Sequence, residues 1–226
     1  MADITGPQSV SGRGAEKFLP LAPSQAPLRA DALRNRRKIL DAATALLAEK
    51  GVDGLTMDEL ARRAGVGKGT LYRNFTDKPG IASALLDDRV RDMHARMLQG
   101  PPPLGPGASG GERLKAFVDA YLNHIARNLD LVLLTESSSP KGRFDREGYP
   151  FWRRHVEILI TEMWTLAEPD SSDANAPERE LIRTRAEAVM AVLSAAQLDQ
   201  WLHRQGRTLD ELIPQIQTIV TAIAAG

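Results

Sequence analysis

The apolar positions of the chain recur mainly at the spacing of an α-helix. Between Ala30 and Lys50 they return every three or four residues, which predicts a helix that ends near Gly51. The same periodicity predicts further helices over 112–129, 147–168, 177–204 and 208–224. A short apolar run at 131–134 is interpreted as a small helix, because no partner strand is evident along the chain. The pattern therefore predicts an all-α protein.

Two short helices joined by a glycine turn are predicted within the first third of the chain. A capping box at Thr56–Glu59 begins the first of them, and Gly65 ends it. The second begins near Lys68, and Asp77 is expected to cap the helix that follows it. Two short helices of this kind, preceded by a packing helix, are the ingredients of a helix-turn-helix.

Composition divides the chain into three parts. Residues 1–28 are rich in Gly, Pro, Ser, Gln and Ala without periodicity, which predicts a flexible N-terminal arm. Residues 29–80 hold the helix-turn-helix pattern, and residues 81–226 form a larger helical unit interrupted by a Pro/Gly-rich loop at Gly100–Gly111. We expect a helix-turn-helix domain at 29–80 and a second, larger helical domain at 81–226.

Charge is balanced over the whole chain but unevenly placed. The chain has 29 basic and 29 acidic residues. Residues 29–80 contain eleven basic and seven acidic side chains, a net charge of +4, whereas residues 81–226 have a net charge of −4. This distribution fits a small unit that binds a polyanion, joined to a second unit with another task.

Several classes of site are excluded or disfavoured by composition. The chain has no cysteine, which excludes disulfides, thiolate zinc sites and cysteine nucleophiles. No catalytic residue, metal site or cofactor is predicted, and the four histidines are far apart in the sequence. No apolar run reaches the roughly 20 residues that span a bilayer, and no secretory signal pattern opens the chain. We therefore expect a cytoplasmic, nucleoid-associated protein without membrane contact.

The second short helix has the features that a DNA-reading helix needs. Such a helix is short and carries small residues near its start, so that its N-terminal end can enter the major groove. Lys68, Gly69 and Thr70 meet this demand. Lysines, hydroxyl groups and helix N-termini bind phosphates well. The predicted partners of the DNA backbone are Thr56, Lys68, Thr70, Tyr72 and Lys78.

Three segments carry a family resemblance: Arg37–Ala43 (RKILDAA), Thr56–Val66 (TMDELARRAGV) and Lys68–Phe75 (KGTLYRNF). In this order they resemble the DNA-binding domain of TetR-type transcriptional regulators, over about residues 32–90 with the helix-turn-helix at about 56–75. The resemblance implies a homodimer of about nine helices per chain, of which three bind operator DNA and the others bind a ligand and dimerise. By motif position, the resemblance implies that Lys78 contacts a phosphate. The residues that it implies face the DNA are Lys68, Gly69, Thr70, Tyr72, Arg73 and Asn74.

Aromatic and methionine side chains in the later helices indicate a ligand pocket. They share helical faces within 112–129 and 147–168, and several bring a polar group to an apolar wall, as suits a small, largely apolar effector. The alternative is an ordinary hydrophobic core. The candidate effector-binding residues are Phe117, Tyr121, His124, Trp152, His155 and Met163.

The predicted helix at 177–204 is apolar around more of its circumference than one core-facing side needs, and the last helix adds further apolar positions. One face can pack on its own chain and the other on a second copy, in an intersubunit four-helix bundle. The alternative is a helix buried on both sides within a monomer, and the resemblance favours the dimer. The predicted dimerisation residues are Leu181, Ala188, Val189, Val192, Ala196, Ile216 and Val220.

The resemblance implies a ligand-responsive repressor that binds a palindromic operator as a homodimer and is released by its effector. Two other classes stay open. A small-molecule or nucleotide-utilising helical enzyme is one, since Gly65–Thr70 superficially resembles a phosphate-binding loop, although Arg62 stands where that motif needs glycine. A helical protein-interaction module is the other. Salt-dependent, sequence-specific binding of a palindromic duplex distinguishes the regulator from both.

Overall fold

The computed structural model describes residues 25–138, 142–145, 148–167 and 176–226. Within these ranges the chain is all-α, as predicted, and has ten α-helices, close to the expected number of about nine. The helices are α1 (Gln25–Lys50), α2 (Met57–Ala64), α3 (Lys68–Asn74), α4 (Lys78–Gln99), α5 (Gly110–Arg127), α6 (Leu129–Ser137), α7 (Gly148–Ala167), α8 (Ala176–Val192), α9 (Ala195–Asp199) and α10 (Leu209–Ala225). Single turns of 3₁₀-helix (η1, Gly142–Asp145) and π-helix (η2, Gln200–Arg204) complete the order.

The first helix begins earlier than its apolar pattern predicts. It starts at Gln25 rather than near Ala30, so residues 25–28 of the predicted flexible arm are helical. Pro27 lies in the first turn of α1, where a missing backbone N–H costs no hydrogen bond, and the helix can therefore extend past the first apolar residue. The rest of the predicted arm, residues 1–24, lies outside the described residues.

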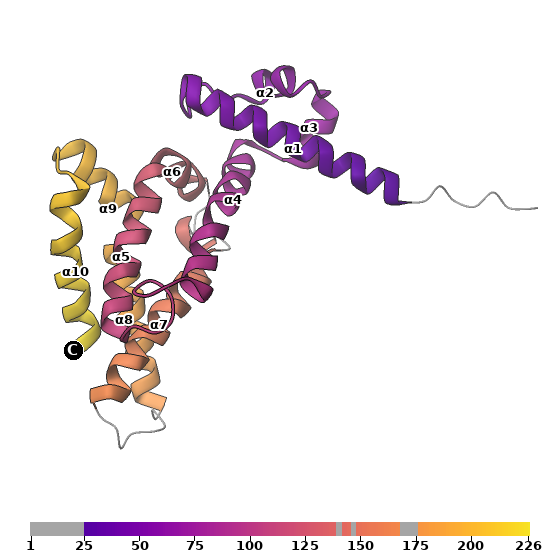
Figure 1. The fold of residues 1–226 in the computed structure, drawn as a ribbon. Coiled ribbons are helices and arrows are strands. Elements are labelled where there is room, and N and C mark those ends of the chain that lie inside the picture. The colour runs from indigo at the N-terminus through magenta and orange to yellow at the C-terminus, as the bar shows by residue number, and fades with distance from the viewer. Residues whose placement is uncertain (1–24, 139–141, 146–147, 168–175) are drawn as a thin grey trace, which may run out of the picture.

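Helices α1–α3 form one unit at the top of the molecule in Figure 1, with α2 and α3 lying along α1. Their shared core includes Ile39 of α1, Leu60 of α2 and Leu71 of α3, all of which are fully buried. Phe75, directly after α3, is also buried, and the guanidinium of Arg36 lies 4.6 Å from its ring centroid. Short helices cannot hold their shape alone, so this core fixes the orientation of α3.

The start of α2 departs in one detail from the predicted capping box. The hydroxyl of Thr56 accepts a hydrogen bond from the backbone N–H of Glu59 at 3.3 Å, as expected. The Glu59 carboxylate does not return the bond, because it accepts from Arg62 and Lys50 instead. These two cations lower the pKa of Glu59 to about 2. Glu59 thus links α2 to the end of α1.

The turn between α2 and α3 requires the backbone freedom of glycine at one position. Gly65 ends α2 with a φ of +63°, in the left-handed region that side chains with a Cβ disfavour. A Cβ placed on Gly65 meets no heavy atom within 4 Å, so the requirement is conformational rather than steric. The sequence-based assignment of Gly65 as the helix stop is confirmed.

Replacing Gly65 by alanine is expected to lower the free energy of unfolding by about 1 kcal/mol through backbone strain alone. Gly111 is the matched control, because it lies within α5 and also has open space where a Cβ would stand. Gly111→Ala should leave stability unchanged or raise it, since alanine favours a helix. Denaturant unfolding of both variants gives the comparison. Equal effects at the two positions would contradict a strained turn.

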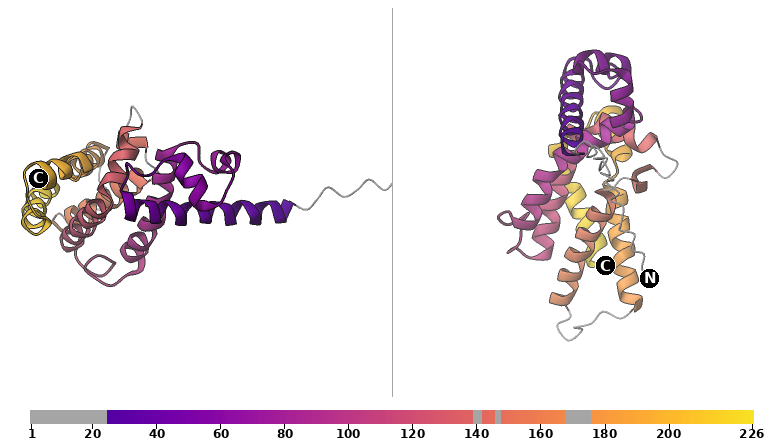
Figure 2. Two further views of the ribbon diagram at one scale, coloured as in Figure 1. Left: turned by 90° about the horizontal axis from the view of Figure 1, so that it is seen from above. Right: turned by 90° about the vertical axis from the view of Figure 1, so that its right-hand side faces the viewer.

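Helix α4 runs from the first three helices into the later ones (Figures 1 and 2). The carboxylate of Asp77 caps it by accepting from the backbone N–H of Gly80 at 2.8 Å, as predicted. Its early residue Ile81 and its late residue Met97 are both fully buried. Because α4 packs on α1 at one end and on α6 further along, a single rigid element spans both parts of the molecule.

Helices α5–α10 pack into a bundle in which α5 contacts α7 and α10, and α8 contacts α7 and α10 (Figure 1). Two capping boxes fix helix starts here, Thr208–Glu211 at α10 as predicted and Ser109–Glu112 at α5. Helix α10 is one continuous helix with Pro214 inside it. None of the described helices is long and apolar enough to cross a membrane.

The helix predicted at 177–204 is broken in the structure. Helix α8 ends at Val192, and the hydroxyl of Ser194 caps a new start by accepting from the backbone N–H of Gln197 at 3.4 Å. The short α9 and the π-helical turn η2 follow. Serine followed by glutamine three residues later is a start signal for a helix, which explains why a continuous apolar pattern did not produce a continuous helix.

Candidate nucleic-acid interface and ligand site

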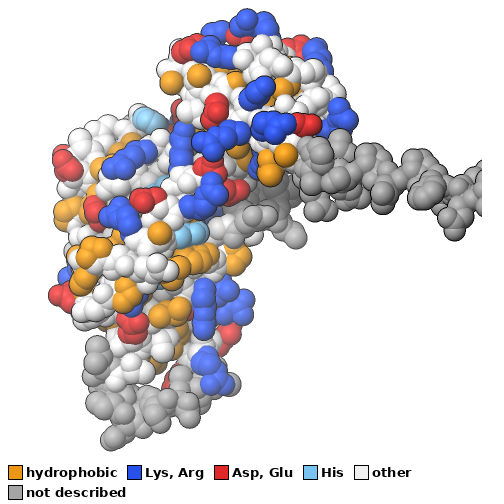
Figure 3. Space-filling view, turned by 45° about the vertical axis from the view of Figure 1, so that its right-hand side comes forward, with side chains coloured by type: hydrophobic (Ala, Val, Ile, Leu, Met, Phe, Trp, Pro, Cys, Tyr) orange, Lys and Arg blue, Asp and Glu red, His pale blue; other side chains and the backbone are white. Residues whose placement is uncertain are grey.

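Helix α3 buries one side and exposes the other. Leu71 and Phe75 anchor it to α1 and α2, whereas Lys68, Tyr72 and Arg73 face outward. Tyr72 has 52 % of its surface exposed, which is high for an aromatic side chain. Figure 3 shows Lys and Arg side chains distributed over the end of the molecule formed by α1–α3. The exposed side of α3 thus combines cations, a hydroxyl group and an aromatic ring on a buried support.

Gly69 lies in the first turn of this exposed side. A Cβ placed there would meet nothing within 4 Å, so packing within the chain does not require glycine at this position. A residue without a side chain leaves the backbone accessible to a large partner. This agrees with the prediction that the start of α3 approaches DNA closely.

Lys68 does not extend freely into solvent. Its ammonium group lies 2.8 Å from a carboxylate oxygen of Asp58 on α2, and this ion pair raises the pKa of Lys68. Both side chains are well exposed. In the structure Lys68 is therefore held by an internal anion that competes with any phosphate for the same charge.

Asp58→Asn is expected to strengthen binding to all DNA sequences by about two- to fivefold, because it frees Lys68 for a phosphate and weak exposed ion pairs are readily exchanged. Asp53→Asn is the matched control, since it makes the same charge change at an exposed position of the preceding turn. Fluorescence anisotropy with labelled duplex DNA measures both. Equal gains for the two variants would assign the effect to net charge and not to Lys68.

Arg73 and Asn74 also bond within α3. The Nε of Arg73 donates to the carbonyl of Gly69 at 3.1 Å, and its second terminal nitrogen donates to the Thr70 hydroxyl at 3.4 Å. The amide of Asn74 donates to the carbonyl of Thr70 at 2.8 Å and is half-buried. Arg73 is exposed and can exchange these bonds for contacts to a base. Asn74 instead completes the last turn of the helix, so its predicted place at the DNA is less accessible than that of Arg73.

The remaining predicted DNA contacts flank the two short helices. Thr56 is exposed at the start of α2, although its hydroxyl oxygen is used in the cap. Lys78 is half-buried at the first position of α4.

The turn at Gly65–Gly67 connects two helices and is not preceded by a strand. The phosphate-binding loop of a nucleotide-utilising enzyme is therefore absent from this part of the described chain.

Six aromatic rings from α4, α5 and α7 form one connected cluster, which we call the aromatic cluster. In α5 the rings of Phe117 and Tyr121 lie 5.3 Å apart, and Trp152 of α7 lies 5.4 Å from Tyr121. His155 lies 5.3 Å from Phe117. Four predicted effector residues therefore meet. The cluster consists of His94, Phe117, Tyr121, Phe151, Trp152 and His155.

Sequence reasoning missed two members of this cluster. The ring of His94, on α4, lies 3.8 Å from that of Phe151 and 4.5 Å from that of Trp152. A signal for His94 was present, since it directly follows Met93, one of the inward-facing positions of its helix. Through His94 the cluster touches the helix that leads to the first three helices.

Two predicted effector residues do not join the aromatic cluster. Met163 lies further along α7, where its side chain packs near Gly110 at the start of α5. His124 is half-buried and lines a separate hollow of about 550 Å³ between α4 and α5, together with Asp92 and Arg96. Residues that share one helical face in the sequence thus contact different neighbouring helices, because their positions along the helix differ.

Burial sets the charge state of the two imidazoles in the cluster. Desolvation, with smaller contributions from the nearby charges of Arg113 and His94, lowers the pKa of His155 to about 4. Desolvation also lowers the pKa of His94. Both rings are therefore neutral at pH 7, and each offers one N–H donor and one acceptor nitrogen.

Known proteins are similar to about half of this chain in sequence and to more than four fifths of it in fold. The profile described as "Bacterial regulatory proteins, tetR family" matches residues 39–85. TtgW of Pseudomonas putida, described as an uncharacterized HTH-type transcriptional regulator, is 30 % identical over 113 residues, which cover 50 % of this chain and 82 % of that protein. The chain belongs to the TetR family. It is accordingly a DNA-binding transcriptional regulator.

Other proteins similar to this TetR-family chain are also described as transcriptional regulators. The HTH-type transcriptional regulator SAB2452 of Staphylococcus aureus is 30 % identical over 122 residues, and the match spans 54 % of this chain and 64 % of that protein. A TetR/AcrR-family regulator from Thermobifida fusca is 26 % identical with a TM-score of 0.54 over 82 % of this chain and 96 % of that one. FadR from Bacillus subtilis, solved with stearoyl-CoA, shares the fold at 18 % identity, with a TM-score of 0.58 over 82 % and 97 %.

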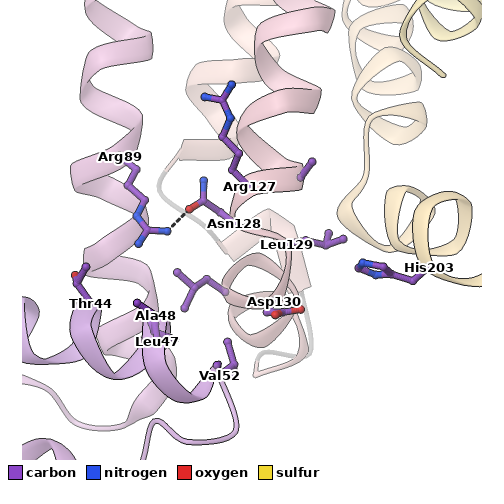
Figure 4. Close-up of a pocket in the computed structure, with 13 residues that line it drawn as sticks. Thr44, Leu47, Ala48, Val52, Arg89, Arg127, Asn128, Leu129, Asp130 and His203 are labelled. Carbon is purple, nitrogen blue, oxygen red and sulfur yellow. Dashed lines mark hydrogen bonds between the residues drawn. The ribbon is translucent and has the colours of Figure 1, made fainter. Parts of the chain in front are cut away.

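A hollow of about 400 Å³ separates the end of α1 from the α5–α6 junction of this TetR-family chain (Figure 4). Arg89 of α4 reaches across its edge and donates a hydrogen bond to the side-chain oxygen of Asn128, which is buried at the junction. The amide nitrogen of Asn128 donates in turn to the carbonyl of His124 at 2.7 Å. These bonds fasten α4 to the point where α5 becomes α6.

The predicted dimerisation face needs a correction. Val189, Ile216 and Val220 are buried in the chain's own core, because α8 and α10 pack on each other and on α5 and α7. They are not available to a second copy. The other predicted residues keep accessible surface and are Leu181, Ala188, Val192 and Ala196. Leu181 is 43 % exposed and Ile219, which was not predicted, is 48 % exposed.

Proposed function

We propose that this TetR-family protein is a repressor that binds a palindromic operator through α3 and is released by a small, largely apolar effector. The observation that carries the proposal is the two-sided character of α3. Its buried side, with Leu71 and Phe75, fixes the helix, and its exposed side presents Lys68, Tyr72 and Arg73. A helix supported in this way can enter the major groove without losing its own core contacts.

A homodimer is part of the proposal. Two copies place their recognition helices about 34–36 Å apart, so that both reach successive major grooves on one side of the duplex. The exposed apolar residues Leu181 and Ile219 of α8 and α10 support a surface that a second copy covers. In this arrangement residues 29–80 bind the operator, and residues 81–226 dimerise and hold the effector.

The aromatic cluster is the proposed effector site. A ligand there favours one arrangement of α4, α5 and α7, and weakens operator binding by its preference for that arrangement. His94 supports this connection, because it belongs both to the cluster and to α4. The stearoyl-CoA in the related FadR structure supports an effector with a large apolar part.

Selection of genomic DNA fragments bound by the full chain tests the proposed function. The expected result is a small set of fragments that share a palindrome, with binding that weakens steeply as the salt concentration rises. Analytical ultracentrifugation with one such fragment should give two chains per site. Binding without sequence preference, or one chain per site, would contradict the proposal.

A further inference from the structure

Three buried nitrogen atoms beside the aromatic cluster have no hydrogen-bond partner among the described residues. They are Nε2 of His94, Nε2 of His155 and Nε of Arg113. His155 is only 7 % exposed. A buried polar atom without a partner costs free energy, and several together are uncommon in a folded protein. Arg113 and His94 both lie close enough to His155 to lower its pKa, so the three groups are neighbours, and one bound group that accepts hydrogen bonds can satisfy them together.

The chemistry of the three nitrogens favours an acceptor that carries negative charge. Arg113 can only donate, and it remains positively charged because a guanidinium does not lose its proton in proteins. One terminal nitrogen donates to both carboxylate oxygens of Glu162, at 2.8 and 3.0 Å, and the buried Nε has no partner among the described residues. The imidazoles of His94 and His155 are neutral, and each can carry its proton on Nε2. The two rings then supply a second and a third donor.

A carboxylate matches this set better than other common groups. It accepts up to about four hydrogen bonds and gains from the charge of Arg113. An ammonium group would be repelled by Arg113, and a neutral ester accepts fewer and weaker bonds. The rings of Phe117, Tyr121 and Trp152 supply an apolar wall beside the nitrogens.

We propose that the effector is a carboxylic acid whose carboxylate accepts hydrogen bonds from Arg113, His94 and His155 and whose apolar body lies against the aromatic cluster. This inference rests on the proposed ligand-controlled function and names the chemical class of its ligand. The acid also joins three helices, since its partners come from α5, α4 and α7.

Binding of the acid requires the cluster to open. The rings of Phe117, Tyr121 and Trp152 are buried, and their centroids lie 5.3 to 6.1 Å apart, so they already pack against one another. The apolar body must therefore move the rings apart. Because Trp152 is one of these rings, its fluorescence reports the movement, and because His94 is on α4, the same movement reaches the helix that leads to the DNA-binding end.

The experiment compares matched acids and esters on the full chain. The probes are decanoate with methyl decanoate and 4-phenylbutyrate with methyl 4-phenylbutyrate. Tryptophan fluorescence and the midpoint of thermal unfolding are followed during titration. We expect at least one acid to bind about tenfold or more tightly than its ester, because only the acid pairs with Arg113. Ester binding equal to acid binding, or no binding by any probe, would overturn the inference.

Variants locate the binding group. His155→Phe is expected to weaken acid binding about tenfold, because phenylalanine keeps a ring in the cluster but removes the Nε2 donor. His203→Phe is the matched control, since His203 is exposed on η2 and bonds to Asp199 at 2.8 Å. If His155→Phe does not fold, His94→Phe takes its place in the same titration. Equal acid affinity in the cluster variant and the control would count against the assignment.

The outcomes separate this inference from the proposed function. If the chain binds acids selectively but binds no specific operator, the carboxylic-acid proposal is supported and the repressor proposal is contradicted. If the chain binds a specific operator that no acid releases, and binds acids and esters equally, operator binding is supported and the carboxylic-acid proposal is contradicted. Release of operator by the acid and not by its ester supports both.

Discussion

Leu71→Ala is expected to abolish specific DNA binding while the later helices stay folded. Leu71 is fully buried and holds the seven-residue α3 against α1 and α2. Truncating a buried leucine to alanine costs about 2–5 kcal/mol, a large part of the stability of so small a core. A helix of two turns does not persist without such support. The exposed side chains of α3 then lose the orientation that a major groove requires.

Leu33→Ala is the matched control for this prediction, because it makes the same chemical change on α1 at a side chain that is 68 % exposed. Its effect on stability should stay within about 0.5 kcal/mol. Thermal unfolding and DNA binding are measured for both variants. Retained operator affinity in Leu71→Ala would mean that α3 does not read the DNA.

Arg73→Ala is expected to weaken operator binding by about 1–3 kcal/mol per half-site and to flatten base preference at one position. Arg73 is exposed on α3, and the bonds it makes to Gly69 and Thr70 are also exposed, so it can exchange them for bonds to a base edge. Binding of a library of single-base operator variants at fixed salt measures the effect.

Lys78→Ala is the control for base reading, since Lys78 is proposed to contact a phosphate. It should weaken binding to all sequences alike and lower the salt slope by about one for each half-site. If Arg73→Ala instead behaved like Lys78→Ala, with every base variant affected equally, Arg73 would be a backbone contact. If Lys78→Ala left both affinity and salt slope unchanged, the phosphate assignment would be wrong.

The helices with local start and stop signals were predictable from the sequence. Gly65, Asp77 and the Thr208–Glu211 capping box act through neighbouring residues only, and each is found as predicted. The break at Ser194 carried an equally local signal, but the apolar period across it was continuous. Where periodicity and a cap disagree, the cap decided the structure.

The aromatic cluster was predictable only in part, because its residues come from helices that are distant in sequence. Phe117, Tyr121, Trp152 and His155 lie on two helical faces and do meet, but His94 reaches them from a third helix whose packing no local pattern encodes. Burial posed a similar difficulty in the last helices. An apolar side chain such as Val220 is equally suited to the chain's own core and to a second copy, and only the packing of α10 decides between them.

The continuity of α4 gives small displacements a long lever arm. Its 22 residues extend over about 33 Å. A pivot of about 5° near its far end, where the carboxylate would bind, shifts the other end by about 3 Å, close to the 3.4 Å rise of one base pair. In the proposed dimer two symmetry-related arms swing together, so the gap between recognition helices would change by nearly twice that amount. A rearrangement confined to the aromatic cluster would thus be sufficient to put the two recognition helices out of phase with successive major grooves.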